Sequence, residues 1–161
     1  MRFLTTFGMT VKMSIQVKNI TKLYGKQKAL NDVSFEVNSG EVVGFLGPNG
    51  AGKSTMMKIL TGFIPQTSGQ ATVCGFDVSE QSLDVRKNVG YLAESNPLYN
   101  DMFVKEYLSF VAELHELKNK TERVKEIISI TGLEVEQRKK IGALSKGYKQ
   151  RVGLAQALIH D

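Results

Sequence analysis

The sequence predicts an α/β protein with strands at the front, a strand–loop–helix unit in the middle and a helical block behind. Residues 14–20 and 33–37 alternate polar and apolar side chains, which is the period of a half-buried strand. Residues 42–46 are apolar apart from one glycine, which suits a strand covered on both faces in a parallel sheet. After Pro97, apolar residues recur at the spacing of amphipathic helices.

Three shorter elements complete the predicted front half. A helix over residues 54–60 follows a glycine-rich loop, and Met57 is among the apolar residues expected on its buried side. Short strands are predicted over residues 71–74 and 89–92.

Three helices are predicted in the back half. The first carries Val104 and Leu108 on its apolar face, and the second begins at Thr121 and is capped at Gly132. The third spans residues 147–159.

The composition is that of an ordinary soluble globular domain. The chain has 161 residues, 42% of them hydrophobic, and a net charge of +5, which excludes a disordered acidic tail and a disulfide-dense mini-protein. Its single cysteine, Cys74, fits a reducing compartment. No aromatic residues alternate with the basic ones, so no nucleic-acid partner is expected. No apolar run approaches the roughly 20 residues of a membrane-spanning helix, so no membrane span is expected either.

The strongest motif lies between the predicted strand at 42–46 and the helix that follows it. Residues 47–54 read Gly-Pro-Asn-Gly-Ala-Gly-Lys-Ser and match G-x-x-x-x-G-K-[ST] without a mismatch. Glycines let successive backbone N–H groups point at phosphate oxygens, and the helix N-terminus adds its positive dipole end. Lys53 would place a charge on the β- and γ-phosphates, and the Ser54 hydroxyl is a hard oxygen ligand for Mg²⁺. The motif therefore predicts a site for a nucleoside triphosphate.

A second candidate phosphate site lies at the start of the last predicted helix. There, Ser145 and Gly147 can offer a hydroxyl and a backbone N–H to an anion. Taken alone, this pair also fits an ordinary capped helix. Two separate phosphate sites in one chain suggest that the second serves the nucleotide of another subunit.

With both motifs in place, the chain from Met13 onward resembles the ATP-binding subunit of ABC transporters. Residues 47–55 look like the Walker A loop of that family. Residues 144–148 look like its Leu-Ser-Gly-Gly-Gln signature, with Lys146 and Tyr148 replacing Gly and Gln. This variant signature resembles bacterial exporters of the ABC-2 type, and residues 94–99 look most like the subgroup associated with gliding motility.

The resemblance implies a set of site residues. Tyr24 falls where the family stacks an aromatic ring on adenine, although a lone Tyr can simply be packed. Glu94 stands where the Q-loop usually has Gln; it is expected to reach Mg²⁺ and to act with Lys53 in catalysis, or else to be a solvated loop residue. The implied ATP-binding residues are Tyr24, Gly47, Pro48, Asn49, Gly50, Ala51, Gly52, Lys53, Ser54 and Thr55. The implied signature residues are Leu144, Ser145, Lys146, Gly147 and Tyr148, and the implied Mg²⁺ ligands are Ser54 and Glu94.

The resemblance also implies a fold and its division. We expect part of a P-loop NTPase domain of the ABC ATPase type, with an N-terminal antiparallel β-subdomain and a helical subdomain. Residues 1–12 are interpreted as an N-terminal extension rather than a secretory signal. The expected parts are residues 13–96 for the β-subdomain with the P-loop core, 97–141 for the helical subdomain and 142–161 for the signature loop and helix.

The family's later elements are not found in this sequence. No run of four apolar residues is followed by Asp-Glu, as the Walker B strand and its catalytic Glu would require. His115 and His160 match no switch motif and are expected on the surface. The sequence is therefore interpreted as the front part of a longer domain.

The implied function is that of an ATPase that binds Mg-ATP and powers a membrane transporter. A homodimer or a pair of ATPase subunits would hold ATP between the Walker A loop of one subunit and the signature of the other. A transmembrane permease subunit would be the second partner, with Tyr99, Met102 and Phe103 as docking or core residues, at the cytoplasmic face of the inner membrane. The alternatives are a truncated nucleotide-binding protein without hydrolysis and a soluble ABC protein of translation or DNA repair.

Overall fold

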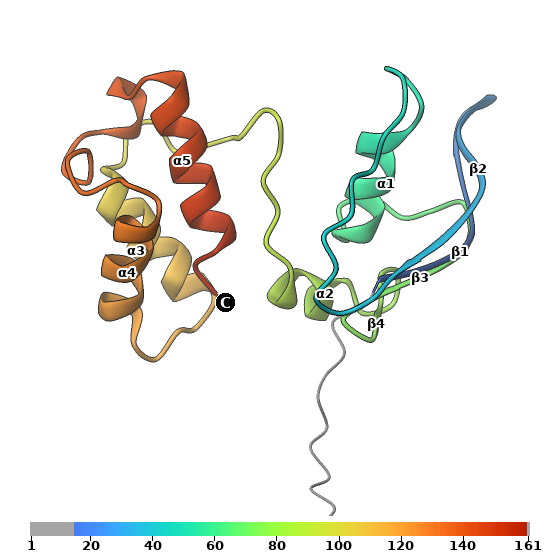
Figure 1. Cartoon of the computed structure of the whole chain (residues 1–161), viewed down its shortest axis with the longest axis horizontal. Coiled ribbons are helices and arrows are strands. Elements are labelled where there is room, and N and C mark those ends of the chain that lie inside the picture. Colours follow the sequence, from blue (N-terminus) through green and yellow to red (C-terminus); the bar gives the residue numbers. More distant parts are fainter. Residues whose placement is uncertain (1–14, 161) are drawn as a thin grey trace, which may run out of the picture. The chain divides into compact units, whose positions relative to one another are not determined.

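A computed structural model describes residues 15–160 of the chain, so the predicted extension at residues 1–12 lies outside the described residues. The chain divides between Arg86 and Lys87 into two compact units, called here the front unit and the back unit. Figure 1 labels the helices and strands of both units.

The front unit is built on a four-stranded antiparallel sheet. The strands are β1 (Ile15–Tyr24), β2 (Gln27–Val37), β3 (Ser68–Val73) and β4 (Phe76–Asp77), in the order β2-β1-β3-β4. Val17 in β1 lies opposite Phe35 in β2 and Ala71 in β3, so that one face of the central strand is buried. This sheet confirms the predicted antiparallel β-subdomain.

β1 continues beyond the strand predicted over residues 14–20, and it contains an irregularity at Asn19. Asn19 has a positive φ of 53°, and its side-chain amide donates a hydrogen bond to Asp32 of β2 at 2.7 Å. The register shifts there, so Val17 and Ile20 are both buried although they lie three residues apart. Strict alternation ends at this bulge, but the strand continues to Tyr24.

Two helices complete the described part of the front unit. α1 (Lys53–Leu60) buries Met56, Ile59 and Leu60, which confirms the predicted helix, but Met57 is exposed rather than buried. A short helix that the sequence analysis did not predict, α2 (Ser82–Asn88), buries Val85, and its last two residues lie past the division at Arg86.

The buried parallel strand predicted over residues 42–46 is wrong for this structure. These residues form no strand, and Val42 and Leu46 are almost fully exposed. Phe45 packs against Phe35 of β2, with 5.4 Å between the ring centres. A parallel strand, however, needs hydrogen-bonding neighbours along its edges, and none of the four described strands pairs with this segment. The strand predicted over residues 89–92 is wrong as well, and that segment lies in the back unit without regular structure.

The back unit is a helical domain with its own hydrophobic core. Its helices are α3 (Val104–Leu114), α4 (Lys120–Ile130), the single 3₁₀ turn η1 (Ile141–Ala143) and α5 (Lys146–Ala157). The three predicted helices are confirmed. The fully buried side chains at the centre include Leu108, Ile127, Leu133, Ile141, Val152 and Ile159.

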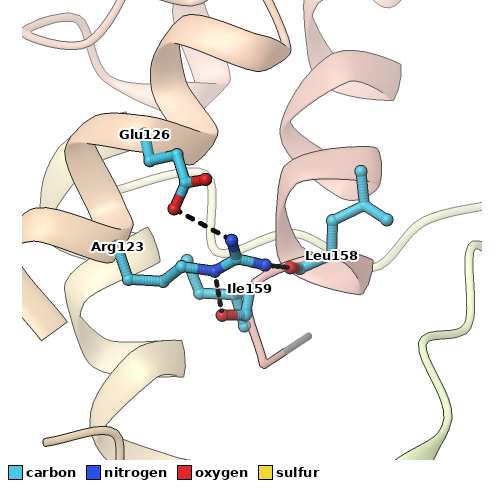
Figure 2. A network of polar contacts seen from close by, with 4 residues as sticks. All are labelled: Arg123, Glu126, Leu158 and Ile159. Atoms are coloured by element: carbon cyan, nitrogen blue, oxygen red, sulfur yellow. Dashed lines mark hydrogen bonds and ion pairs between the residues drawn. The ribbon is translucent and has the colours of Figure 1, made fainter. Parts of the chain in front are cut away.

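Polar contacts fix both sides of α5 within this core. The Tyr107 hydroxyl of α3 donates to the side-chain oxygen of Gln156 at 2.6 Å. The Arg123 guanidinium of α4 donates to the backbone carbonyls of Leu158 (2.6 Å) and Ile159 (3.0 Å) and pairs with Glu126, as Figure 2 shows. Since the last carbonyls of a helix have no partners within it, Arg123 satisfies the C-terminal end of α5 and complements its dipole.

Candidate functional site

The glycine-rich loop at residues 47–52 leads directly into α1. Gly52 is the N-cap residue, with φ 85°, and a Cβ on it would overlap the backbone oxygen of Ala29 in β2. Only glycine fits both the conformation and this close approach. The first helical bond runs from the N–H of Met56 to the Gly52 carbonyl, which leaves the preceding N–H groups at the helix start without intrahelical partners. α1 has no acidic residue in its first turn to compete with an anion there.

The Lys53 side chain folds back onto the loop. Its ammonium donates to the carbonyls of Gly47 at 2.6 Å and Pro48 at 2.7 Å. The charge is thereby held over the loop that the motif assigns to phosphate. Ser54 is exposed and Thr55 is half-buried, so both side chains lie at the surface of the first turn.

The other three predicted loop residues with side chains, Pro48, Asn49 and Ala51, are exposed. The Ala51 N–H donates to the Pro48 carbonyl at 3.2 Å, which closes a turn within the loop. Tyr24 lies at the end of β1 with half of its surface exposed, and the Lys22 ammonium is 5.3 Å from its ring centre. The ring is therefore not packed in the core of the front unit.

The predicted signature residues occupy the loop and first turn that start α5 in the back unit. The Ser145 hydroxyl caps the helix by accepting a hydrogen bond from the Tyr148 N–H at 3.4 Å. Leu144 is buried, while Lys146 and Gly147 are exposed. Tyr148 packs against the helical core, with the Arg151 guanidinium 5.2 Å from its ring centre. The capped-helix interpretation is thus correct, and it leaves the exposed first turn open to an anion.

Glu94 also lies in the back unit, in an exposed segment without regular structure. Its backbone carbonyl accepts a hydrogen bond from the Gln150 side chain of α5 at 3.3 Å. Its carboxylate is left at the surface.

The described residues offer few ligands for a metal ion. Between residues 15 and 160, no group of three or more His, Cys, Asp or Glu side chains could hold one. A Mg²⁺ site at the loop therefore fits only if phosphate oxygens and water complete the coordination, which is how Mg²⁺ is usually bound with nucleotides. The exposed Ser54 hydroxyl at the start of α1 is a suitable hard oxygen donor.

Both histidines, expected on the surface, are only partly exposed. His115 and His160 are partly buried, and their rings stack at 4.3 Å between centres and 8° between planes. Burial lowers the pKa of His115 from its ordinary value. These residues join the end of α3 to the segment after α5, and they belong to the packing of the back unit.

Sequence reasoning missed one arrangement that involves a predicted site residue. Residues 90–96, which include Glu94, lie along α5, with Gly90 against Ala157 and with Leu92 and Asn96 against Gly153. The sequence contains the two glycines, Gly90 and Gly153, that allow this close packing. Their spacing does not indicate that residues 90–96 contact the last predicted helix.

Comparison with known proteins settles the family. The family profile described as "ABC transporter" matches residues 30–161. The chain belongs to this family. It is 36% identical over 159 residues to the probable multidrug ABC transporter ATP-binding protein YbhF of Escherichia coli, covering 98% of this chain and 28% of the relative. It is 35% identical to the bacitracin transport ATP-binding protein BcrA of Bacillus licheniformis, covering 91% and 47% of the two chains.

Solved structures of ABC proteins share the fold. A structure described as the ATP-binding subunit of an ABC transporter matches with a TM-score of 0.83 and 29% identity, covering 91% of this chain and 62% of that one. The dimeric structure of MJ0796, a bacterial ABC transporter cassette, matches with a TM-score of 0.81 and 26% identity, covering 91% and 69%.

The family confirms the fold class that the sequence predicts, a partial ABC ATPase domain with an antiparallel β-subdomain and helices. The chain spans less than half the length of the two curated relatives. Among residues 15–160, no helix is both long and apolar enough to cross a bilayer.

Proposed function

We propose that this chain is the nucleotide-binding part of an ABC ATPase that binds Mg-ATP, hydrolyses it within a complete domain and powers a bacterial transporter. The observation that carries the proposal is the loop at residues 47–54, which matches the phosphate-binding motif fully and ends at a helix N-terminus with Gly52 in the conformation that only glycine tolerates.

In this proposal, different residues bind different parts of Mg-ATP. Backbone N–H groups at the start of α1 bind phosphate oxygens, and Lys53 exchanges the carbonyls of Gly47 and Pro48 for the β- and γ-phosphates. Tyr24, with its exposed ring, stacks on the adenine. The Ser54 hydroxyl and the Glu94 carboxylate would hold Mg²⁺, and the ion would neutralise charge on the phosphates.

The signature residues serve the ATP of a partner subunit in this proposal. Ser145 and the N–H of Gly147 face the partner's γ-phosphate from the start of α5, and the exposed Lys146 adds positive charge there. The dimeric structure of MJ0796 supports a paired arrangement for this fold. A transmembrane permease subunit at the cytoplasmic face of the inner membrane is the further partner, contacted through the exposed Tyr99 and Phe103, whereas Met102 packs against the core of the back unit.

A nucleotide-binding role without hydrolysis is the second candidate. The sequence has no apolar run followed by Asp-Glu, so it contains no general base of the kind this family places after its Walker B strand. Phosphate release by the chain with and without a full-length ATPase subunit separates the two candidates, because hydrolysis restored only by the full-length subunit assigns the base to that subunit.

The proposal is tested first at Lys53. We expect Lys53→Ala to weaken Mg-ATP binding at least tenfold, or about 1.4 kcal/mol, because the change removes the charge that faces the β- and γ-phosphates. Isothermal titration calorimetry with Mg-ATP measures this affinity. Lys58→Ala is the matched control, since Lys58 is an exposed lysine in the last turn of the same helix. Equal affinities in the two variants would contradict the proposal.

A further inference from the structure

Residues 90–96 lie along one face of α5, the helix that begins with the signature. The three positions of α5 that they contact are Gln150, Gly153 and Ala157. These positions are spaced by three and four residues and so fall on the same side of the helix. The segment that carries Glu94 and the helix that follows Ser145 are therefore in contact over about two turns.

The middle of this contact depends on Gly153. The side-chain ends of Leu92 and Asn96 occupy the space where a Cβ on Gly153 would lie. Because these atoms are the ends of flexible side chains, a small side chain at position 153 could push them aside. Gly153 therefore allows residues 90–96 to pack closely on α5, but it is not the only residue on which this packing depends.

The contact at Gly90 is between backbones and cannot yield in the same way. A Cβ on Gly90 would overlap the carbonyl oxygen of Ala157 and lie 2.8 Å from its carbonyl carbon. The backbone of Gly90 does not have a positive φ, so glycine is needed there for space rather than for conformation.

The α5 side of this contact is itself held in place. The carbonyls of Leu158 and Ile159, next to the Ala157 carbonyl, accept hydrogen bonds from the Arg123 guanidinium of α4 (Figure 2). The last turn of α5 therefore cannot simply move away, and an added methyl at position 90 would displace residues 90–96 instead.

We propose that Gly90 is a positioning residue that seats residues 90–96 on α5, so that Glu94 and the signature residues at the start of α5 move as one body. The inference rests on the proposed function, because it gives Glu94 a place at the γ-phosphate of ATP. A shift of Glu94 on binding or loss of that phosphate is then carried by a rigid helix of 12 residues to Ser145.

The contact between residues 90–96 and α5 is tested by measuring the distance between two spin labels in the full chain. In a Cys74→Ser background, which removes the single cysteine, spin labels are attached to Ser95→Cys and Leu154→Cys, both exposed positions. Pulsed electron paramagnetic resonance should give one narrow distance distribution, unchanged by Mg-ATP. We expect Gly90→Ala to broaden or lengthen this distribution, with no ligand required.

Two further glycine-to-alanine variants serve as comparisons for Gly90→Ala. Gly44→Ala adds the same methyl where no atom lies within 4 Å, and it should leave the distribution unchanged. Gly153→Ala should broaden it less than Gly90→Ala does, and it preserves the test if Gly90→Ala fails to fold. The proposal is overturned if Gly90→Ala or Gly153→Ala gives the same distance distribution as Gly44→Ala. It is also overturned if Mg-ATP changes the distance in the parent protein.

A second readout separates positioning from general stability. Gly90→Ala should keep the affinity for Mg-free ADP within about twofold, because the loop at residues 47–55 is in the front unit and ADP lacks the γ-phosphate that Glu94 is proposed to contact, while self-association in saturating Mg-ATP falls about tenfold. Undiminished association overturns the link to the signature. If the parent chain does not bind Mg-ATP, the proposed function fails, whereas the ligand-free distances still decide whether Gly90 seats the segment.

Discussion

Gly52 is the residue on which the shape of the phosphate loop depends most directly. Its φ of 85° lies in the left-handed region, and its Cα lies so near the Ala29 carbonyl that no side chain fits. Conformation and space therefore both demand glycine. Gly25 shares only the first of these constraints, because its φ is 58° but no atom lies within 4 Å of a Cβ placed there.

This difference gives a prediction for two alanine variants. Gly25→Ala should cost about 1–2 kcal/mol of stability, the ordinary penalty for the left-handed conformation, and should leave Mg-ATP binding unchanged. Gly52→Ala should cost more and should weaken Mg-ATP binding at least tenfold, because the loop must move away from β2. Urea unfolding and calorimetry measure the two quantities. Equal effects in both variants would show that the close approach at Ala29 is unimportant.

Residue types and spacing were enough to find this loop, because its chemistry is local. Eight consecutive residues carry the glycines, Lys53 and Ser54, and the helix that they predict begins at Lys53. The contact of Gly90 with Ala157 could not be found in this way. It joins residues far apart in the sequence, and nothing in either local pattern identifies the other.

At the scale of whole elements, the helices could be predicted from local sequence, whereas the strands depend on partners far away in the sequence. The back-unit helices were predictable because each one carries its own apolar stripe, such as Val104, Leu108 and Val111 in α3. The segments at 42–46 and 89–92 were predicted as strands from apolar character alone. A strand also needs neighbours to pair with, and none of the described strands supplies them.

Arg123 gives a prediction for the C-terminal end of α5. Arg123→Ala should lower the free energy of unfolding by about 1–3 kcal/mol, because the carbonyls of Leu158 and Ile159 lose a charged donor. Arg123→Lys should recover only part of this, since a single ammonium cannot match the geometry of the planar guanidinium. Urea unfolding measures the loss.

The ion pair with Glu126 is expected to matter less than these two carbonyl contacts. Glu126 is more than half exposed, and exposed pairs contribute about 0–1 kcal/mol. Glu126→Gln is therefore the matched control for Arg123→Ala. If the two variants lose equal stability, the ion pair and not the helix end is what Arg123 stabilises.

At the scale of the whole chain, the two units have separate sources of stability. The front unit buries residues of its antiparallel sheet and of α1, whereas the back unit has a continuous core among α3, α4 and α5. A change confined to one core is therefore expected to act mainly on the unit that contains it. His115 provides such a change, because its protonation state can be set from outside by pH.

Burial lowers the pKa of His115 in the folded chain from its ordinary value of 6.5, and its ring stacks on His160. Below about pH 6.5 the unfolded chain binds the proton more readily than the folded chain does, so stability falls as pH decreases through that range. Hydrogen exchange of α3 and α5 amides between pH 7.5 and 5.5, corrected for the intrinsic rate, should show this loss in the back unit. His115→Gln should flatten this dependence. An equal loss in the β1–β3 amides, or an unchanged slope in the variant, would mean that His115 is not the group responsible.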